Sequence, residues 1–515
     1  MLVSRSGHKV DFKVDEKKLK RLLELKIELG DDFPKFGIFI LCYNASLLIE
    51  STLSRIDPKL KSIIEEVFIF DDNSPDGTFE VIKSLTSNSP WAEKINIFKN
   101  STNLRYGGNQ KVGYRYAIER GLDYSIMLHG DGQYAPEYIV DLILPAVEDK
   151  YDVVFASRMM VGNSALRGGM PLYKYVGNKV LTTFENFILG TRLTEFHSGY
   201  RMYSSKFLKK IPFHENTDDF HFDTEIIIQA RHLGVPIKEV PIQAFYGDED
   251  CNVNGFLYAF DVCKAVLFYR FHQLHFIRKP NYIVDRRYIH QRKKNRFSSH
   301  QIILNQIQQR DKRVLYVGKD EDLLVGDLVE RGMKVTLLLD DTLQQENYKA
   351  VSIRKLDMES ESLGLGREKY DVIILSDVLA KVPNPTLLIE KCSNLINGEE
   401  GQMIASVPNI AIWAYRLSLL FGRFNYASAG PLDRRNLRHF TRFSLIRLFK
   451  TLGIKVVKIE PTTLPLEVYF QSSGRSRLIK LLEGAYYLLC RSYSQLFAYQ
   501  FVSVVKLKST LLEAK

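Results

Sequence analysis

Short apolar segments of strand length alternate with helical segments through the first half of the chain. The strand-like segments lie at 36–42, 66–70, 95–98 and 124–128, and all are rich in β-branched and aromatic residues. Strands that alternate with helices form βαβ units, which build a parallel sheet with right-handed crossovers. The sequence therefore predicts an α/β fold whose parallel strands all end at one edge of a sheet.

Acidic residues follow directly after two of these predicted strands. Asp71 and Asp72 end the second strand, and Asp131 follows the fourth. A carboxylate at the end of a buried strand is costly unless a ligand or partner uses it. An Asp-Gly turn would explain one such site but not two at the same edge. The pattern favours a nucleotide site in which Asp131 holds a divalent cation, while Asp72 and Asp76 accept hydrogen bonds from a base or a ribose.

Two further motifs place charged side chains at the ends of predicted elements. Arg158 follows the strand-like segment 153–157 and could clamp a phosphate with two hydrogen bonds. Asp223 and Glu225 stand at the head of the amphipathic stretch 226–233, where a helix dipole favours the ionised form. A general base that deprotonates an acceptor hydroxyl is one interpretation of Asp223, and simple N-capping is the other, with about equal weight.

Length and charge bound the classes of protein that this chain can be. Its 515 residues predict two or three domains, and 45% hydrophobic with 25% charged residues are ordinary globular values. Much of the net charge of +11 gathers in the basic stretch 270–313. This stretch predicts either contact with an anionic membrane or a solvated helix and linker. We expect no nucleic-acid partner.

The cysteines and the N-terminus bear on the cellular compartment. Five scattered cysteines form neither a disulfide framework nor a metal-binding pattern. The first residues lead into no apolar core of a signal peptide, and no run reaches the roughly 20 apolar residues that a membrane span needs. We expect a cytoplasmic protein. Peripheral attachment to the inner membrane face is compatible with this location.

The chain repeats its α/β pattern after a change of composition near residue 268. The basic, polar stretch 282–309 is interpreted as a linker, and strand-like segments then recur at 313–318, 334–340, 369–377 and 403–409. Helical spacing at 475–505 predicts a packed terminal helix. We predict four parts, namely a helical extension at 1–33, an α/β domain at 34–268, a basic linker at 269–310 and a second α/β domain at 311–515.

The ordered motifs of residues 34–265 resemble those of the family 2 glycosyltransferases, which have the GT-A fold. The segment 70–78 (Phe-Asp-Asp-Asn-Ser-Pro-Asp-Gly-Thr) is very similar to that of dolichol-phosphate mannose synthases. Gly-Asp-Gly-Gln at 130–133 matches the metal-binding DxD region, with His129 where the first Asp usually stands. The other matching segments are Tyr43-Asn44, Ser157-Arg158, Ser198-Gly199-Tyr200-Arg201 and Phe222-Asp223-Thr224-Glu225.

This resemblance implies an inverting, metal-dependent transferase. The donor would be a UDP- or GDP-sugar and the acceptor a glycan or a lipid-linked carrier, in the biosynthesis of cell-surface polysaccharide or glycolipid. Asp131, assisted by His129, would hold Mg or Mn, and Asp223 or Glu225 would be the base. The residues implied in substrate binding are Tyr43, Asn44, Asp72, Asp76, Arg158, Gly199 and Arg201.

Residues 311–510 resemble class I methyltransferases that use S-adenosylmethionine, on the segments 377–385 and 406–409. The cofactor loop departs from the family pattern, because Tyr316 replaces the acidic residue and aspartates stand where two glycines belong. Gly318 survives, and the resemblance implies Asp340 and Asp357 as contacts for ribose and adenine. The departures favour a domain that no longer methylates. The alternatives are a working second activity, which would make the enzyme bifunctional, and a non-catalytic scaffold.

Overall fold

The computed structural model divides the chain into two compact units. The first contains residues Met1–His272 and Arg278–Arg286, and the second contains Gln273–Ile277 and Arg287–Lys515. The residues that the structure describes are 2–3, 9–10, 12–87, 89–162, 164–246, 254–273, 277–283, 295–307, 312–318, 323–339, 352–355, 363, 365–366, 368–398, 400–427, 430–465 and 477–507.

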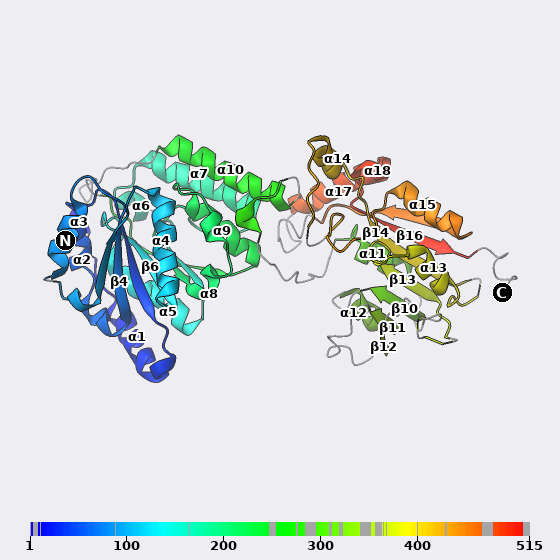
Figure 1. The fold of residues 1–515 in the computed structure, drawn as a ribbon, viewed down its shortest axis with the longest axis horizontal. Helices are drawn as coiled ribbons and strands as arrows, with labels where there is room; N and C mark the ends of the chain where they lie inside the picture. Colours follow the sequence, from blue (N-terminus) through cyan, green and yellow to red (C-terminus); the bar gives the residue numbers. More distant parts are fainter. Residues whose placement is uncertain are drawn as a thin grey trace. The chain divides into compact units, whose positions relative to one another are not determined.

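The first unit is built on a seven-stranded sheet in the order β5-β4-β3-β6-β8-β7-β9 (Figure 1). All four predicted strands are present, and they pair in parallel. The sheet is nevertheless mixed, because β8 runs antiparallel to both β6 and β7. The strands are β3 (Phe36–Cys42), β4 (Ile64–Asp71), β5 (Ile95–Lys99), β6 (Tyr124–His129), β7 (Val153–Ser157), β8 (Arg201–Ser204) and β9 (Ile237–Pro241), with a separate small pair of β1 (Leu2–Val3) and β2 (Lys9–Val10).

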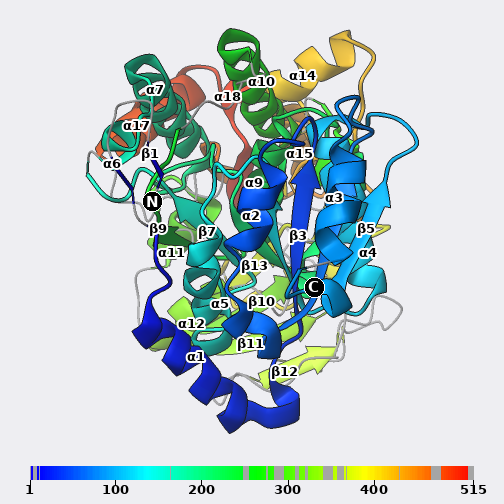
Figure 2. The ribbon, with the colours of Figure 1, turned by 90° about the vertical axis from the view of Figure 1, so that its left-hand side faces the viewer.

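Helices cover both faces of this sheet. Leu19, Leu22 and Leu25 of the N-terminal helix are buried in the core that also holds β3 and β4, while Ile27 is 83% exposed. Figures 1 and 2 both place α7 and α10 at one end of the unit and α1 at the other. The helices are α1 (Glu16–Leu29), α2 (Ile49–Ser54), α3 (Thr78–Ser87), α4 (Arg105–Glu119), α5 (Ile139–Glu148), α6 (Ser164–Arg167), α7 (Leu172–Leu189), α8 (Ser205–Leu208), α9 (Phe222–Leu233) and α10 (Gly255–Gln273).

The second unit has its own seven-stranded sheet, in the order β12-β11-β10-β13-β14-β16-β15. The last strand of the chain, β16, runs antiparallel to β14 and to β15, and the other pairs are parallel. The predicted terminal helix at 475–505 is therefore only partly right, because its last residues form β16. The strands are β10 (Arg313–Gly318), β11 (Lys334–Leu339), β12 (Ser352–Lys355), β13 (Val372–Ser376), β14 (Gln402–Pro408), β15 (Lys455–Pro461) and β16 (Gln500–Lys506).

Part of the predicted basic linker belongs to the second unit. Ile302, Ile303 and Leu304 lie in α11 and are buried with residues of β10 and β16 in one hydrophobic core. No helix in the described part of the chain is both long and apolar enough to cross a membrane. The helices of this unit are α11 (Ser299–Gln306), α12 (Leu323–Glu330), α13 (Pro385–Ser393), α14 (Trp413–Leu420), α15 (Arg442–Thr451), α17 (Arg477–Ser492) and α18 (Ser494–Phe497).

Candidate active site

The two acidic strand ends of the first unit lie on either side of β3. In the register of the sheet, Cys42 pairs with Asp71 on β4, and Leu41 pairs with His129 on β6. The chain after each strand is anchored to β3, because Asp72 N donates to Cys42 O at 2.9 Å and Gly130 N donates to Leu41 O at 2.9 Å. The structure thus brings together the strand ends that the sequence pattern singled out.

The loops after β3 and β4 hold one another through the side chains of the second acidic motif. Asp76 accepts from Ser46 N at 3.1 Å and from Thr78 Oγ1 at 2.6 Å. Burial opposes the charge, but these hydrogen bonds lower the pKa of Asp76 below its usual value. Asn44, with φ of 51°, donates its N–H to Ser74 Oγ at 3.0 Å, and Tyr43 beside it is exposed. Asp76 and Asn44 therefore shape the rim of the site.

Asp72 is buried behind this rim. Its Oδ1 accepts from Asn100 Nδ2 at 2.8 Å and from Leu104 N at 2.8 Å. Burial raises the pKa of Asp72 above its usual value, although both hydrogen bonds oppose the rise. Asp72 therefore fixes the segment that leads into α4, and its contact with a base or ribose stays a prediction.

Asp131 and His129 occupy the mouth of the site at the end of β6. The Asp131 side chain is 37% exposed, and its Oδ2 lies 4.0 Å from His129 Nδ1. Burial lowers the pKa of His129 below its usual value, although Asp131 and Asp223 oppose this, so the imidazole is neutral near pH 7. A carboxylate and a neutral imidazole are suitable metal ligands. Within the described residues, no group of three or more His, Cys, Asp or Glu side chains comes together as a metal site.

A short chain of polar contacts joins His129 to Asp223. Tyr106 OH lies 3.3 Å from His129 Nε2 and donates to Asp223 Oδ2 at 2.9 Å. Burial, reinforced by Asp223, raises the pKa of Tyr106 well above its usual value, so this hydroxyl keeps its proton. Gln110 Nε2 donates to the other oxygen of Asp223 at 3.3 Å. Asp131, His129, Tyr106 and Asp223 thus form a continuous line of polar contacts that starts at the end of β6.

The two candidate bases point to different places. Asp223 makes no capping hydrogen bond, since the N-cap residue of α9 is His221, and the N-capping interpretation is therefore wrong. Glu225 instead accepts from Thr217 N at 2.6 Å and from Asn281 Nδ2 at 2.9 Å. Burial raises the pKa of Glu225 to about 7. Only Asp223 of the pair contacts the residues around His129.

Arg201 and Gly199 position this arrangement from β8 and the loop before it. The buried Arg201 guanidinium donates to Ser198 O at 2.6 Å and to Asp223 O at 3.0 Å, and its Nη2 lies 3.7 Å from Asp223 Oδ2. A Cβ at Gly199 would lie 2.5 Å from His129 Nε2, so only glycine lets the loop approach the imidazole this closely. Both residues were predicted to bind substrate, and the structure places them behind the reactive groups.

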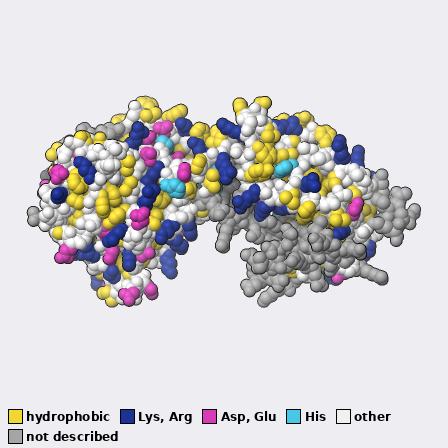
Figure 3. Space-filling view, viewed as in Figure 1, with side chains coloured by type: hydrophobic (Ala, Val, Ile, Leu, Met, Phe, Trp, Pro, Cys, Tyr) yellow, Lys and Arg dark blue, Asp and Glu magenta, His cyan; other side chains and the backbone are white. Residues whose placement is uncertain are grey.

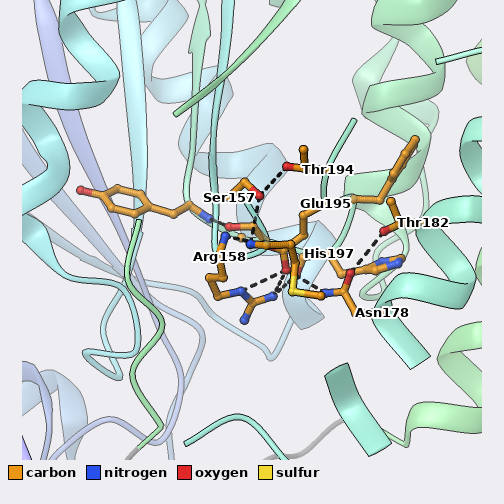
Figure 4. Close-up of polar contacts among 12 residues, drawn as sticks. Ser157, Arg158, Asn178, Thr182, Thr194, Glu195 and His197 are labelled. Atoms are coloured by element: carbon orange, nitrogen blue, oxygen red, sulfur yellow. Dashed lines mark hydrogen bonds and ion pairs between the residues drawn. The ribbon is translucent and has the colours of Figure 1, made fainter. Parts of the chain in front are cut away.

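Arg158 is buried and paired with a carboxylate of the protein. Its guanidinium forms an ion pair with Glu195 and donates to Tyr246 OH at 2.9 Å and to His197 O at 3.1 Å (Figure 4). Burial opposes the charge, but Glu195 raises the pKa of Arg158 well above its usual value. Glu195 thus pairs with the Arg158 guanidinium inside the protein, and the phosphate clamp stays a prediction.

The sequence interpretation missed Tyr106 and Gln110. Both lie in the first turns of α4, where Gly107 and Gly108 donate their N–H groups to Asp218 O at 2.6 and 3.2 Å. A Cβ at Gly107 would lie 2.5 Å from Thr217 O. The paired glycines were the available signal, since they allow α4 to approach the segment that leads into α9 and so bring Tyr106 to Asp223.

The corresponding region of the second unit is described only in part, because the residues directly after Gly318 lie outside the described residues. Gly318 ends β10, and a Cβ there would lie 2.7 Å from the ring of Tyr316. Asp377 follows β13; its Oδ1 accepts from Ser406 Oγ and its Oδ2 from Gln500 Nε2, both at 2.8 Å. The predicted cofactor contacts Asp340 and Asp357 lie outside the described residues.

Comparisons with known proteins match a part of the chain. Residues 37–212 match the family model described as Glycosyl transferase family 2. The chain is 28% identical to the UDP-N-acetylglucosamine–dolichyl-phosphate N-acetylglucosaminyltransferase of Methanococcus voltae, over 41% of this chain and 85% of that protein. It is 25% identical to the undecaprenyl-phosphate mannosyltransferase of Micrococcus luteus, over 39% and 79%. Among solved structures, mannosyl-3-phosphoglycerate synthase from Rubrobacter xylanophilus matches with a TM-score of 0.38 and 13% identity, over 51% and 85%. The prediction of a glycosyltransferase domain is confirmed for the matched residues.

Proposed function

Because residues 37–212 match the model of glycosyl transferase family 2, we propose that this enzyme transfers a sugar from a nucleotide-diphospho-sugar to the phosphate of a lipid carrier. The observation that carries the proposal is the line of Asp131, His129, Tyr106 and Asp223 at the end of β6. Two relatives support the acceptor class, since their names give dolichyl phosphate and undecaprenyl phosphate.

The donor side of the proposed site is the mouth formed by Asp131 and His129. Their carboxylate and neutral imidazole fit a divalent cation such as Mg or Mn, with the donor diphosphate and water completing the coordination. A bound cation would stabilise the negative charge that develops on the departing nucleoside diphosphate. Asp76 and Asn44 hold the two loops that would frame the nucleotide.

The acceptor side lies at Asp223. An acceptor oxygen forms a bond to the anomeric carbon as the bond from that carbon to the diphosphate breaks, and the configuration inverts. A phosphate acceptor is already ionised, so Asp223 then orients Tyr106 and the acceptor instead of removing a proton. A glycan hydroxyl is the second candidate acceptor, because Asp223 is held by Tyr106 and Gln110 as a general base would be.

The test is transfer from UDP- and GDP-sugars to a short polyprenyl phosphate by the full-length protein, with Mn or Mg. Asp131→Asn and Asp223→Asn should each abolish most of the transfer, and Glu225→Gln should leave it largely intact because Glu225 faces Thr217 and Asn281. Wild-type-like turnover of Asp131→Asn with either metal would overturn the site assignment. Faster transfer to a glycan hydroxyl than to the lipid phosphate would favour the second acceptor.

For the second unit we propose a methyltransferase-like fold that no longer methylates. The central parallel strands and the antiparallel β16 support the fold part of this proposal. The covered Gly318 and the internally bonded Asp377 support the loss of activity. A bifunctional enzyme with a working methyltransferase is the alternative, and titration with S-adenosylmethionine separates the two.

A lipid-phosphate acceptor also bears on location. An enzyme that meets cytoplasmic nucleotide-sugars and a membrane-bound carrier would work at the cytoplasmic face of a membrane. Fractionation of cells, with the protein followed in the membrane and cytosolic fractions at low and high salt, tests this part of the proposal.

A further inference from the structure

Helix α7 turns polar side chains inward and apolar side chains outward. Asn178, Thr182 and Glu185 are buried on one side of the helix. The opposite side exposes apolar side chains that recur at helical spacing. These exposed side chains are Tyr173, Val176, Val180 and Phe187. This is the reverse of the pattern that a surface helix of a globular protein shows.

The inward polar side chains of α7 have partners, which explains their burial. Asn178 Nδ2 donates to Glu195 Oε1 at 2.8 Å, and Thr182 Oγ1 donates to Asn178 Oδ1 at 3.2 Å (Figure 4). Glu185 Oε2 lies 3.2 Å from His197 Nε2. The orientation of α7 is therefore fixed from inside the unit, and its apolar side is held outward.

Helix α10 extends this apolar surface. His197 links the two helices, because its Nδ1 lies 2.9 Å from Tyr258 OH on α10 while its Nε2 contacts Glu185 on α7. Figure 3 shows hydrophobic side chains along the end of the first unit where both helices lie. The exposed apolar side chains of α10 are Phe256, Leu257, Phe260, Leu267 and Phe271.

The charge on these helices indicates what covers the surface. The exposed positions of α7 and α10 include Lys179 and Lys264 and no Asp or Glu. Apolar side chains flanked by lysines match the boundary between acyl chains and anionic headgroups of a bilayer. We propose that the outward sides of α7 and α10, called here the α7–α10 face, bind the surface of an anionic phospholipid bilayer.

The α7–α10 face is connected to the candidate active site. His197 and Gly199 lie in the same loop, and Gly199 packs against His129. A bilayer on this face would therefore present a lipid-linked phosphate close to Asp223, and this step rests on the proposed function. Attachment to the bilayer itself does not depend on catalysis.

Sedimentation with vesicles tests the attachment. The full-length protein should pellet with vesicles that contain phosphatidylglycerol and much less with pure phosphatidylcholine, at low salt. Val180→Glu and Phe260→Glu change side chains that are 63% and 65% exposed, so the fold should tolerate them. Each should weaken binding about tenfold, because a charge replaces an inserted apolar group. Ile27→Glu, at an exposed position on α1, is the matched control and should bind like wild type.

The lysines have a smaller expected effect. Lys179→Gln and Lys264→Gln should each weaken binding severalfold at low salt and little at high salt, because headgroup attraction is screened. Lys17→Gln on α1 is the matched control. Equal binding of wild type and all these variants, or no pelleting of the wild type, would overturn the proposal.

Two further measurements separate the alternatives. If the face is a contact between copies of the chain, Val180→Glu will change the mass in solution while the wild type fails to pellet, and the proposal is then wrong. With a water-soluble prenyl phosphate, Val180→Glu should transfer sugar at the wild-type rate. If the wild type binds vesicles but transfers no sugar, the proposal for the α7–α10 face is supported and the proposed function is overturned.

Discussion

The two units carry acidic residues after the parallel strands of similar sheets, and they use them differently. In the first unit, Asp131 after β6 is partly exposed and lies at one end of a polar line that reaches Asp223. In the second, Asp377 after β13 has both oxygens bound to Ser406 and Gln500. Asp131 accepts a hydrogen bond at Oδ1 from Gln133 N at 3.0 Å, so more of its carboxylate remains for a ligand than at Asp377.

The largest expected effect comes from the substitution Asp223→Asn, which removes the carboxylate at one end of the polar line in the first unit. Asp223→Asn removes the charge that orients Tyr106 and, in the proposed reaction, the acceptor, and it should lower kcat about a thousandfold. Initial rates of sugar transfer and thermal melting check this. Glu225→Gln, two residues along α9, should keep kcat near the wild-type value. Equal losses of kcat in the two variants would show that transfer depends on the structure of α9 and not on the Asp223 carboxylate.

Gly199→Ala tests how tightly the polar line is positioned. The new Cβ would meet His129 Nε2 at 2.5 Å and displace the imidazole or the loop, and a shift of about 1 Å is expected to lower kcat about a hundredfold. Gly177→Ala is the matched control, because a Cβ at Gly177 has no neighbour within 4 Å. Unchanged transfer in Gly199→Ala would mean that His129 does not need its observed position.

Glu225 provides a smaller effect that appears in stability. Burial raises its pKa from 4.5 to about 7, so the folded state holds a proton that the unfolded state releases. This contribution to stability is full below pH 4.5 and is lost as the pH rises to 7, amounting to about 3 kcal/mol. Glu225→Gln should remove that dependence. Melting temperatures of the wild type and of Glu225→Gln, measured between pH 5 and 8, test this. Parallel curves of melting temperature against pH would contradict the raised pKa of Glu225.

The smallest expected effect is that of S-adenosylmethionine, for which we expect no binding. S-adenosylmethionine at millimolar concentration should give no binding heat with the full-length protein, because Tyr316 covers Gly318 and Asp377 is already bonded. Calorimetry with the cofactor and with its demethylated product checks this. Saturable binding would make the second unit a working cofactor site and remove the contrast between the two sheets.

The sequence predicted the strands, because hydrophobic periodicity is a local signal, and it predicted that Asp71 and Asp131 follow strands flanking β3, because strands of βαβ units end at one edge of the sheet. It could not predict that Glu195, distant in the chain, neutralises Arg158. The choice between Asp223 and Glu225 also escaped it, since both stand in the first turn of one helix and only packing aims them apart. The strands β8 and β16 were missed, because β8 has only four residues and the segment of β16 was predicted as the end of a terminal helix.

The outward apolar side of α7 has a consequence for how the enzyme's rate is described. An enzyme held on a bilayer by Val180 and its neighbours meets a lipid-linked acceptor by diffusion in two dimensions. The rate then follows the mole fraction of acceptor in the lipid and not its molarity in the sample. Adding inert phospholipid at constant total acceptor should therefore slow transfer, as it does for enzymes that obey surface-dilution kinetics.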